Sequence, residues 1–330
     1  MANDRMIHPS LTYSHCLLIP LTRSCGAHCD YCTFKNNDGK LLSFDEIEEL
    51  LRRTIDTGIC EVVLSAGQSL ETLDDISTQW QSRGYASFID YVRDICQLIL
   101  ENRLIPSLDI GPMSYTDLES VAPYIASVQL LLENMNPEFT KTVQQNKSLD
   151  AKIETLSDAG LLRMPVTTGL LVGLGESPDD LFHTLDAIAE LHHKYHHIQS
   201  VIFQHVFRET AEPNFKIEDV RRLLAYSKKM MPDVAISIPA NAPPSWLDVI
   251  SSGVDDIGRI FEGHDGFDWN KTFPKLTELE RGLSRKGVSL KPRFPIFAQQ
   301  FAQRSHDELI ASVYKEWMNK KEFIYYWDHL

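Results

Sequence analysis

The sequence has no long apolar run. No stretch approaches the roughly 20 residues needed to span a bilayer, and residues 1–10 are polar, without the apolar core of a secretory signal. Basic residues are also scarce, because 32 Lys and Arg stand against 46 Asp and Glu, giving a formal charge of −14. Phosphate binding draws on clustered Lys and Arg, so a nucleic-acid partner is not expected. We expect a cytoplasmic protein with neither a membrane nor a nucleic-acid partner.

Cysteine is sparse too, and its distribution is uneven. Three of the six cysteines, Cys25, Cys29 and Cys32, occupy one short loop with the spacing C-x3-C-x2-C, directly after an apolar segment. The second cysteine pair that a structural zinc site would need does not follow, and structural disulfides would need an oxidising compartment. The remaining cysteines lie far apart in apolar surroundings and are expected to be small core residues: Cys16, Cys60 and Cys96.

Three thiols in one loop indicate a particular kind of metal centre. A [4Fe–4S] cluster normally takes four thiolates, so a loop that offers three leaves one iron with an open coordination position. A small chelating ligand can bind there. The alternative is a zinc ion with His28 as the fourth ligand, although His28 lies inside the loop, where closing a tetrahedron would be strained.

At these residues the sequence resembles the radical S-adenosylmethionine (SAM) superfamily, whose signature has this spacing with an aromatic residue before the third cysteine, here Tyr31. In that family the amino and carboxylate groups of SAM chelate the open iron. One electron from the reduced cluster then cleaves SAM to methionine and a 5′-deoxyadenosyl radical. The resemblance implies a [4Fe–4S] cluster on the three cysteines, SAM as a cofactor, a small-molecule substrate, and an electron donor such as flavodoxin or ferredoxin.

The resemblance is closer still to the small subunits of 7,8-didemethyl-8-hydroxy-5-deazariboflavin synthase. It extends over most of residues 12–297, and the matching segments are 13–14, 19–22, 29–34, 167–176 and 197–199. This family implies formation of a 5-deazaflavin ring from a hydroxybenzyl-diaminouracil adduct. It also implies a partner radical SAM subunit that supplies the adduct.

Strand-like and helix-like segments alternate along the chain. Strands are expected at 16–22, 60–65, 105–110, 127–132, 165–172, 198–206, 234–238 and 255–260, and helices at 43–57, 87–102, 117–121, 149–159, 178–193, 217–230 and 275–286. Residues 80–84 are expected in a polar loop. Eight strands with short connections predict a parallel (β/α)8 TIM-type barrel. We place the barrel domain at 1–304 and a C-terminal helical extension at 305–330, packed on the outside of the barrel or in a dimer contact.

In such barrels the loops at the carboxyl ends of the strands build the site. By resemblance, the turn at 66–68 would hold the SAM amino group, Glu133 the ribose or amino group, Lys152 the carboxylate, and Val172 or Leu174 the adenine. A plain turn at 66–68 and a solvated helix lysine at 152 remain open alternatives. The expected cofactor-binding residues are Tyr31, Ala66, Gly67, Gln68, Glu133, Lys152, Val172 and Leu174.

Candidate substrate contacts are polar side chains near the carboxyl ends of strands. Satisfied core hydrogen bonds explain each of them as well as a ligand does. They are Asp109, Thr168, Gln204, His205 and Asn241. Aromatic candidates to line the substrate cavity are Tyr85, Phe203 and Phe207. We interpret a histidine-rich helix end as solvated rather than metal-binding: His192, His193, His196 and His197.

Three segments depart from the deazaflavin family. At 67–71 this chain has Gly-Gln-Ser-Leu-Glu where the family has Gly-Glu-Arg-Pro-Glu, and at 143–147 it has Val-Gln-Gln-Asn-Lys where the family has a segment with Pro-His. At 256–262 it has Asp-Ile-Gly-Arg-Ile-Phe-Glu where the family has Asp-Trp-Gly-Gly-Ile-Ser-Pro. We interpret these as substrate-facing loops. One alternative is therefore a diverged radical SAM paralogue with another aromatic or amino-acid-derived substrate. An alternative of another class is a non-catalytic iron–sulfur sensor or electron carrier.

Overall fold

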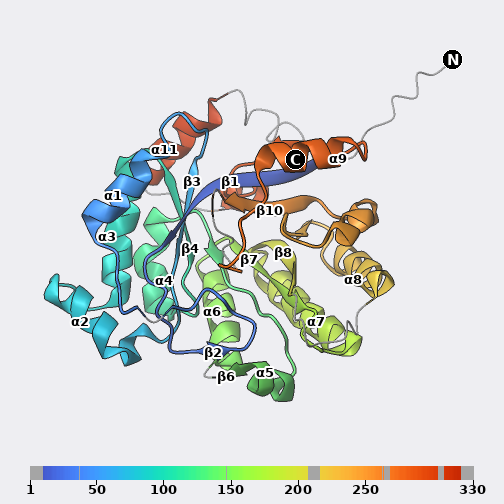
Figure 1. Ribbon diagram of the computed structural model, residues 1–330, viewed down its shortest axis with the longest axis horizontal. Coiled ribbons are helices and arrows are strands. Elements are labelled where there is room, and N and C mark those ends of the chain that lie inside the picture. Colours follow the sequence, from blue (N-terminus) through green and yellow to red (C-terminus); the bar gives the residue numbers. More distant parts are fainter. Residues whose placement is uncertain are drawn as a thin grey trace.

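The structure is a computed structural model that describes residues 10–36, 38–145, 147–206, 216–261, 263, 268–303 and 308–320. Eight parallel strands form a closed barrel surrounded by helices (Figure 1). In ring order they are β1 (Ser10–Pro20), β3 (Glu61–Ser65), β4 (Ile105–Asp109), β5 (Val128–Gln129), β7 (Val166–Val172), β8 (Ile198–His205), β9 (Ala235–Ser237) and β10 (Asp256–Phe261). The pairing of β10 with β1 closes the ring. The predicted TIM-type fold is confirmed.

The strands are apolar because they are covered on both faces. Every residue of β3 and of β7 is buried, as expected for parallel strands with helices outside and packed side chains inside. A ninth parallel strand, β11 (Ser289–Pro292), pairs with the start of β1 outside the ring. The sequence does not predict β11, because its alternating exposed and half-buried residues lack an apolar run.

Helices cover the outside of the barrel (Figure 1). Those that the sequence predicts are α1 (Phe44–Arg52), α3 (Phe88–Glu101), α4 (Tyr115–Val121), α6 (Leu149–Leu161), α7 (Pro178–Tyr195), α8 (Ile217–Met230) and α9 (Leu276–Ser284). Five of them begin at a serine whose hydroxyl accepts a backbone N–H of the first turn: Ser43, Ser87, Ser114, Ser148 and Ser177. The sequence analysis did not predict α5 (Pro137–Val143), α10 (Ala298–Gln303), η1 (Leu70–Thr72), η2 (Ala122–Tyr124) or η3 (Pro244–Ser252).

The polar loop expected at 80–84 is wrong in part, because helix α2 (Asp74–Ser82) occupies most of this connection. Ile76 and Trp80, one turn apart, are buried and fix the helix to the rest of the molecule. Two apolar positions in a polar stretch are too weak a signal to predict a helix. This helix forms a wall beside the site.

A small second sheet joins the cysteine loop to a distant connection. Strand β2 (His28–Cys29), inside the cysteine loop, pairs antiparallel with β6 (Gln144–Gln145), which lies between β5 and α6. Asp30 N–H also donates to Val143 O at 3.2 Å. The cysteine loop is therefore held by backbone hydrogen bonds to residues 143–145, in the connection between β5 and α6.

Helix α11 (Glu308–Met318) packs against α3 and β4. Trp317 Nε1 donates to Arg103 O at 2.7 Å, and Arg103 Nε lies 2.7 Å from a carboxylate oxygen of Glu316. Val313 and Tyr314 are fully buried. The domain division at residue 304 stays a prediction, and residues 321–330 of the expected extension lie outside the described residues.

The other three cysteines are core residues, as predicted. Cys16, Cys60 and Cys96 are buried and none forms a disulfide. None of the described helices combines the length and the apolar character needed to cross a bilayer.

Candidate active site

The cysteine loop follows β1 at the carboxyl end of the barrel. Cys25, Cys29 and Cys32 are half-buried, and none is in a disulfide. The loop closes on itself through Cys32 N–H, which donates to Cys29 O at 3.1 Å, and Lys35 Nζ, which donates to Ala27 O at 2.9 Å. Three unpaired thiols on one ordered, accessible loop fit the donor set of a site-differentiated [4Fe–4S] cluster.

The turn after β3 packs directly on this loop. Gly26 N–H donates to Gln68 O at 2.8 Å, and Gln68 N–H donates to Cys25 Sγ at 3.3 Å. A Cβ on Gly67 would lie 2.0 Å from Ser24 O and 2.6 Å from Cys25 Cβ, so only glycine fits there. Gly67 therefore lets the two loops approach each other. The backbone N–H of Gln68 donates to a sulfur that would ligate the cluster, and such hydrogen bonds tune the reduction potential of a cluster.

A second brace holds the other side of the loop. Thr33 Oγ1 donates to Asp268 Oδ1 at 2.8 Å. The Arg23 guanidinium lies 4.4 Å from the centre of the Trp269 ring and donates from Nε to Phe34 O at 2.7 Å. The sequence offers no signal for this contact, because residues 23–34 and 268–269 meet only in the folded barrel.

Beside the loop lies a buried group of charges centred on Glu133, which has a positive φ of 72° at the end of the β5 segment. Its carboxylate oxygens lie 2.9 Å from Lys147 Nζ and 2.7 Å from Lys152 Nζ. Burial opposes ionisation of Glu133, but the two ammonium groups outweigh burial and lower its pKa to about 2. Burial lowers the pKa of Lys152 to about 8, although Glu133 favours its charged form.

This group contains two cations and one carboxylate, so it carries a surplus positive charge next to the cysteine loop. Lys152 is nearly fully buried, and the interpretation of it as a solvated helix lysine is therefore wrong. Buried charge without a partner is costly. An anionic group of a ligand would remove that cost.

Lys147 is a site residue that the sequence analysis missed. It donates to the Tyr31 hydroxyl at 3.5 Å, as does Gln144 Nε2 at 3.0 Å. Burial raises the pKa of Tyr31, so its ring stays neutral. The departure at 143–147 therefore lies against the cysteine loop, and its role as a substrate-facing loop stays a prediction. Asn146 lies outside the described residues.

A cavity of about 200 Å³ opens at the carboxyl ends of the strands. Three of the expected cofactor residues line it: Ala66, Gln68 and Glu133. Three of the expected substrate residues line it as well: Asp109, Gln204 and Asn241. Its lining also contains residues that the sequence analysis did not select, among them Gln129, Lys147, Arg259, Phe261 and Phe273. The phenyl rings supply apolar surface on the side of β10.

Arg259 forms part of the lining through a chain of hydrogen bonds across the barrel. Its Nη2 lies 2.7 Å from Glu61 Oε1, and its Nη1 donates to Gln129 Oε1 at 2.8 Å. Gln129 Nε2 in turn donates to Asp109 Oδ2 at 2.9 Å. Burial raises the pKa of Asp109, although Arg259 and Gln129 oppose that shift. The Asp109 carboxyl is thus held in place at the cavity and is more easily protonated than an ordinary aspartate.

The structure does not bring every expected residue to this cavity. Thr168 is fully buried, and its hydroxyl accepts Leu132 N–H at 3.2 Å, which is a satisfied core hydrogen bond. The His205 ring packs edge-on against Trp246 at 5.2 Å. Other expected positions that do not line the cavity are Tyr31, Gly67, Lys152, Val172, Leu174, Tyr85 and Phe203. Leu174 packs in a small cluster that includes Tyr31, Tyr85 stacks with Phe44, and Phe207 lies outside the described residues.

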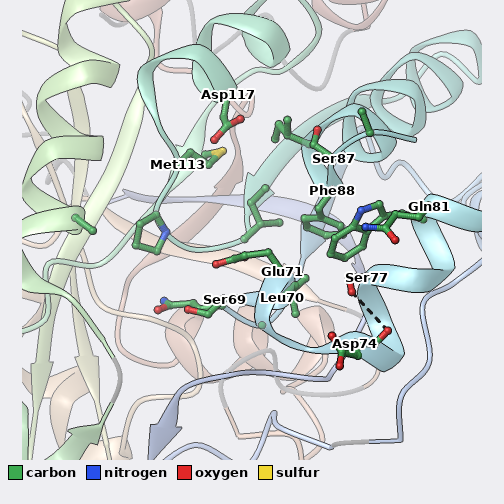
Figure 2. Close-up of a pocket in the computed structure, with 18 of the residues that line it drawn as sticks. Ser69, Leu70, Glu71, Asp74, Ser77, Gln81, Ser87, Phe88, Met113 and Asp117 are labelled. Carbon is green, nitrogen blue, oxygen red and sulfur yellow. Dashed lines mark hydrogen bonds between the residues drawn. The ribbon is translucent and has the colours of Figure 1, made fainter. Parts of the chain in front are cut away.

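A larger cavity of about 740 Å³ lies next to the first and is bounded by α2, the start of α3 and the loop before α4. Figure 2 shows carboxylates of Glu71, Asp74 and Asp117 around it. Gln68 lines both cavities, and its side chain crosses over Gly111. The departure at 67–71 thus forms a wall of this outer cavity. None of the expected substrate residues lines it, so we assign the site to the smaller cavity.

Comparison with known proteins agrees with this geometry. The family model described as the radical SAM superfamily matches residues 19–188, just over half of the chain. The chain belongs to the radical SAM superfamily. It is a radical SAM enzyme of the synthase type, and membership implies a [4Fe–4S] cluster and SAM. The structure of HydG, a maturase of the [FeFe]-hydrogenase, superposes with a TM-score of 0.70 at 14% identity, covering 92% of this chain and 69% of that one.

Two curated relatives carry the same activity name. The 7,8-didemethyl-8-hydroxy-5-deazariboflavin synthase of Methanothermobacter thermautotrophicus is 30% identical over 303 residues, covering 87% of this chain and 92% of the relative. The protein of the same name from Methanococcus maripaludis is 30% identical over 321 residues, covering 93% and 96%. The predicted resemblance to this family is confirmed.

Proposed function

We propose that this enzyme binds a [4Fe–4S] cluster through Cys25, Cys29 and Cys32, cleaves SAM, and forms a 5-deazaflavin ring from a hydroxybenzyl-diaminouracil adduct. One observation carries the proposal. Ala66, Gln68, Glu133 and Lys147 line one cavity at the carboxyl end of the barrel, and two of these residues also bond to the cysteine loop: Gln68 N–H donates to Cys25 Sγ and Lys147 Nζ to the Tyr31 hydroxyl. An electron carrier would need the thiols but not a ligand cavity with a surplus positive charge.

When bound, the cluster supplies the electron that cleaves SAM to methionine and a 5′-deoxyadenosyl radical. The residues around it position the reactants. Lys147 and Lys152 would bind the SAM carboxylate, and Glu133 would accept from its amino group or ribose. Asp109, Gln204 and Asn241 would bind polar edges of the substrate, while Phe261 and Phe273 keep water from the radical.

Anaerobic reconstitution tests the proposal in two steps. The reconstituted protein is reduced with dithionite in the presence of SAM, and 5′-deoxyadenosine is measured. Its formation supports the radical SAM activity, whereas a cluster that only changes oxidation state supports a sensor or carrier. The adduct from the partner subunit is then added, and deazaflavin fluorescence is measured.

A second candidate is a paralogue with another substrate, and Arg259 favours it. The deazaflavin family carries glycine at the corresponding place in its Asp-Trp-Gly-Gly-Ile-Ser-Pro stretch, whereas here a guanidinium lines the cavity. A side chain of this size changes both the room and the hydrogen-bonding groups available to a substrate. SAM cleavage without deazaflavin fluorescence would support this candidate over the first.

A further inference from the structure

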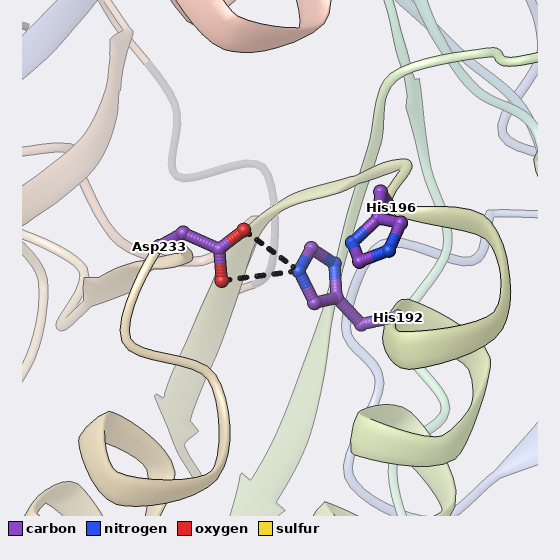
Figure 3. A group of neighbouring side chains, drawn as sticks. All are labelled: His192, His196 and Asp233. Atoms are coloured by element: carbon purple, nitrogen blue, oxygen red, sulfur yellow. Dashed lines mark hydrogen bonds and ion pairs between the residues drawn. The ribbon is translucent and has the colours of Figure 1, made fainter.

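A second group of metal-ligating side chains lies at the opposite end of the barrel from the cysteine loop. It consists of His192 and His196 at the end of α7 and Asp233 in the turn between α8 and β9 (Figure 3). Strand β8 begins directly after this end of α7, so the group lies at the amino ends of the strands. It is therefore separate from the cavity and the cluster.

The three side chains converge in space. One ligand atom from each residue lies within 4.8 Å of the other two. His192 Nε2 is 3.2 Å from both carboxylate oxygens of Asp233, and the two imidazole rings are 5.5 Å apart, nearly perpendicular. Figure 3 shows the His192 ring between the carboxylate and the His196 ring.

The backbone fixes this arrangement. His196 ends α7 in a left-handed conformation with φ 53°, and its N–H donates to His192 O at 2.7 Å. This bond keeps the two histidines four residues apart on one side of the helix end, the spacing at which paired histidines bind metal. The neighbouring His193 is engaged elsewhere, because its Nε2 lies 2.9 Å from Met230 O.

His192 is not a solvated helix-end residue, so the sequence interpretation is wrong for it. It is only 1% exposed. Its Nε2 faces Asp233, and its Nδ1 has no hydrogen-bond partner among the residues that the structure describes. With the ring proton on Nδ1, the lone pair of Nε2 faces the Asp233 carboxylate, so an ion between these two groups would be bound by both.

We propose that His192, His196 and Asp233 form a binding site for a divalent transition metal ion such as Zn²⁺. Imidazole nitrogens with one carboxylate favour zinc or its neighbours over Mg²⁺ or Ca²⁺, which prefer oxygen. His192 forms the buried floor, while His196 and Asp233 are exposed and leave a path for the ion. A bound ion would link the end of α7 to the turn after α8.

The site requires only small movements. Bond lengths of about 2.0–2.2 Å place the ligand atoms of a tetrahedral zinc ion about 3.3–3.6 Å apart. The present spacing, within 4.8 Å, narrows to that range through rotation of the two exposed side chains. Three protein ligands leave the fourth position for water.

Zinc binding by the cluster-loaded protein, purified without a histidine tag, tests the proposal. Zn²⁺ is titrated in competition with a chromophoric chelator under anaerobic conditions, and iron content is followed to verify that the cluster is retained. We expect one Zn²⁺ per chain and a Zn²⁺-dependent rise in Tm. His196→Ala and Asp233→Asn should each weaken binding at least about tenfold and remove the rise in Tm.

The matched control is His183→Ala, which removes an exposed histidine from the same helix. It should bind Zn²⁺ as the wild type does. The proposal is overturned if the wild-type protein binds no Zn²⁺, or if either site variant binds it with wild-type affinity. Melting each variant without metal shows that a lost site is not simply a lost fold.

Discussion

Two groups of buried charges lie in this barrel, and they differ in balance. In the interior, Glu61 pairs with Arg259 at 2.7 Å, and Asp256 pairs with Arg293 at 2.7 Å, so each carboxylate has one guanidinium. Beside the cysteine loop, Glu133 alone faces two lysines. The interior pairs are balanced one to one, whereas the group at the loop has two ammonium groups for one carboxylate.

The comparison separates charges that are balanced within the protein from charges that are not. Removing one partner of a complete buried pair leaves the other uncompensated and destabilises the fold. Removing one lysine from the group at the loop leaves Glu133 still paired with the other. We therefore expect interior variants to lose stability and loop-side variants to lose ligand affinity.

The largest effect on ligand binding is expected from substitutions of the three loop cysteines. Replacing Cys25, Cys29 or Cys32 by alanine should abolish iron binding and 5′-deoxyadenosine formation while leaving the fold intact, since these residues are only half-buried. Iron content and product analysis measure this. Cys96→Ala is the control and should keep its iron, because Cys96 is a core residue. Retention of SAM cleavage by a loop variant would refute the assignment.

The next effect is on stability. Arg259→Met leaves the Glu61 carboxylate buried without its guanidinium, which should lower the free energy of unfolding by about 3–5 kcal/mol. Urea denaturation measures the loss. Adding Glu61→Gln to the same chain should recover most of it, since the uncompensated charge is gone. If Arg259→Met is as stable as the wild type, the distinction between the two groups fails.

A smaller effect is expected on the binding side. Lys152→Met should weaken SAM binding about 10–100-fold, the value of one charged hydrogen bond, with little change in the free energy of unfolding. Anaerobic calorimetry on cluster-loaded protein measures the affinity. Lys141→Met, which alters an exposed ion pair, is the control. An unchanged affinity in the Lys152 variant would mean that the surplus charge serves another ligand.

The smallest effect is a pH dependence. Because the pKa of Lys152 is about 8, its charge is present at pH 7 and lost as the pH rises through 8, so SAM affinity should fall about tenfold by pH 9. The unfolded chain keeps this proton to higher pH. The contribution of Lys152 to the free energy of unfolding should therefore rise as the pH increases from 8 to lysine's ordinary pKa. The difference between wild-type and Lys152→Met profiles isolates both effects. Parallel profiles would assign the titration to another group.

Local patterns predict the parts of the site that lie close together in the sequence. The three thiols stand within eight residues, so their convergence needs no tertiary information. The strand ends also predict that Asp109 and Glu133 lie at one cavity, because parallel barrels collect such ends on one rim. Thr168 and His205 show the limit of that rule, since a strand end does not reveal whether a side chain faces the cavity or a neighbouring element.

The sequence by itself determined the barrel and the cysteine loop, because apolar periodicity and cysteine spacing act over short stretches of chain. Only the tertiary structure decided which charged and polar side chains meet, since Lys147, Gln129 and Arg259 come from separate connections and strands. It also decided that His192 is buried against Asp233. Burial and pairing depend on residues far apart in the chain, and a single sequence carries no record of those distances.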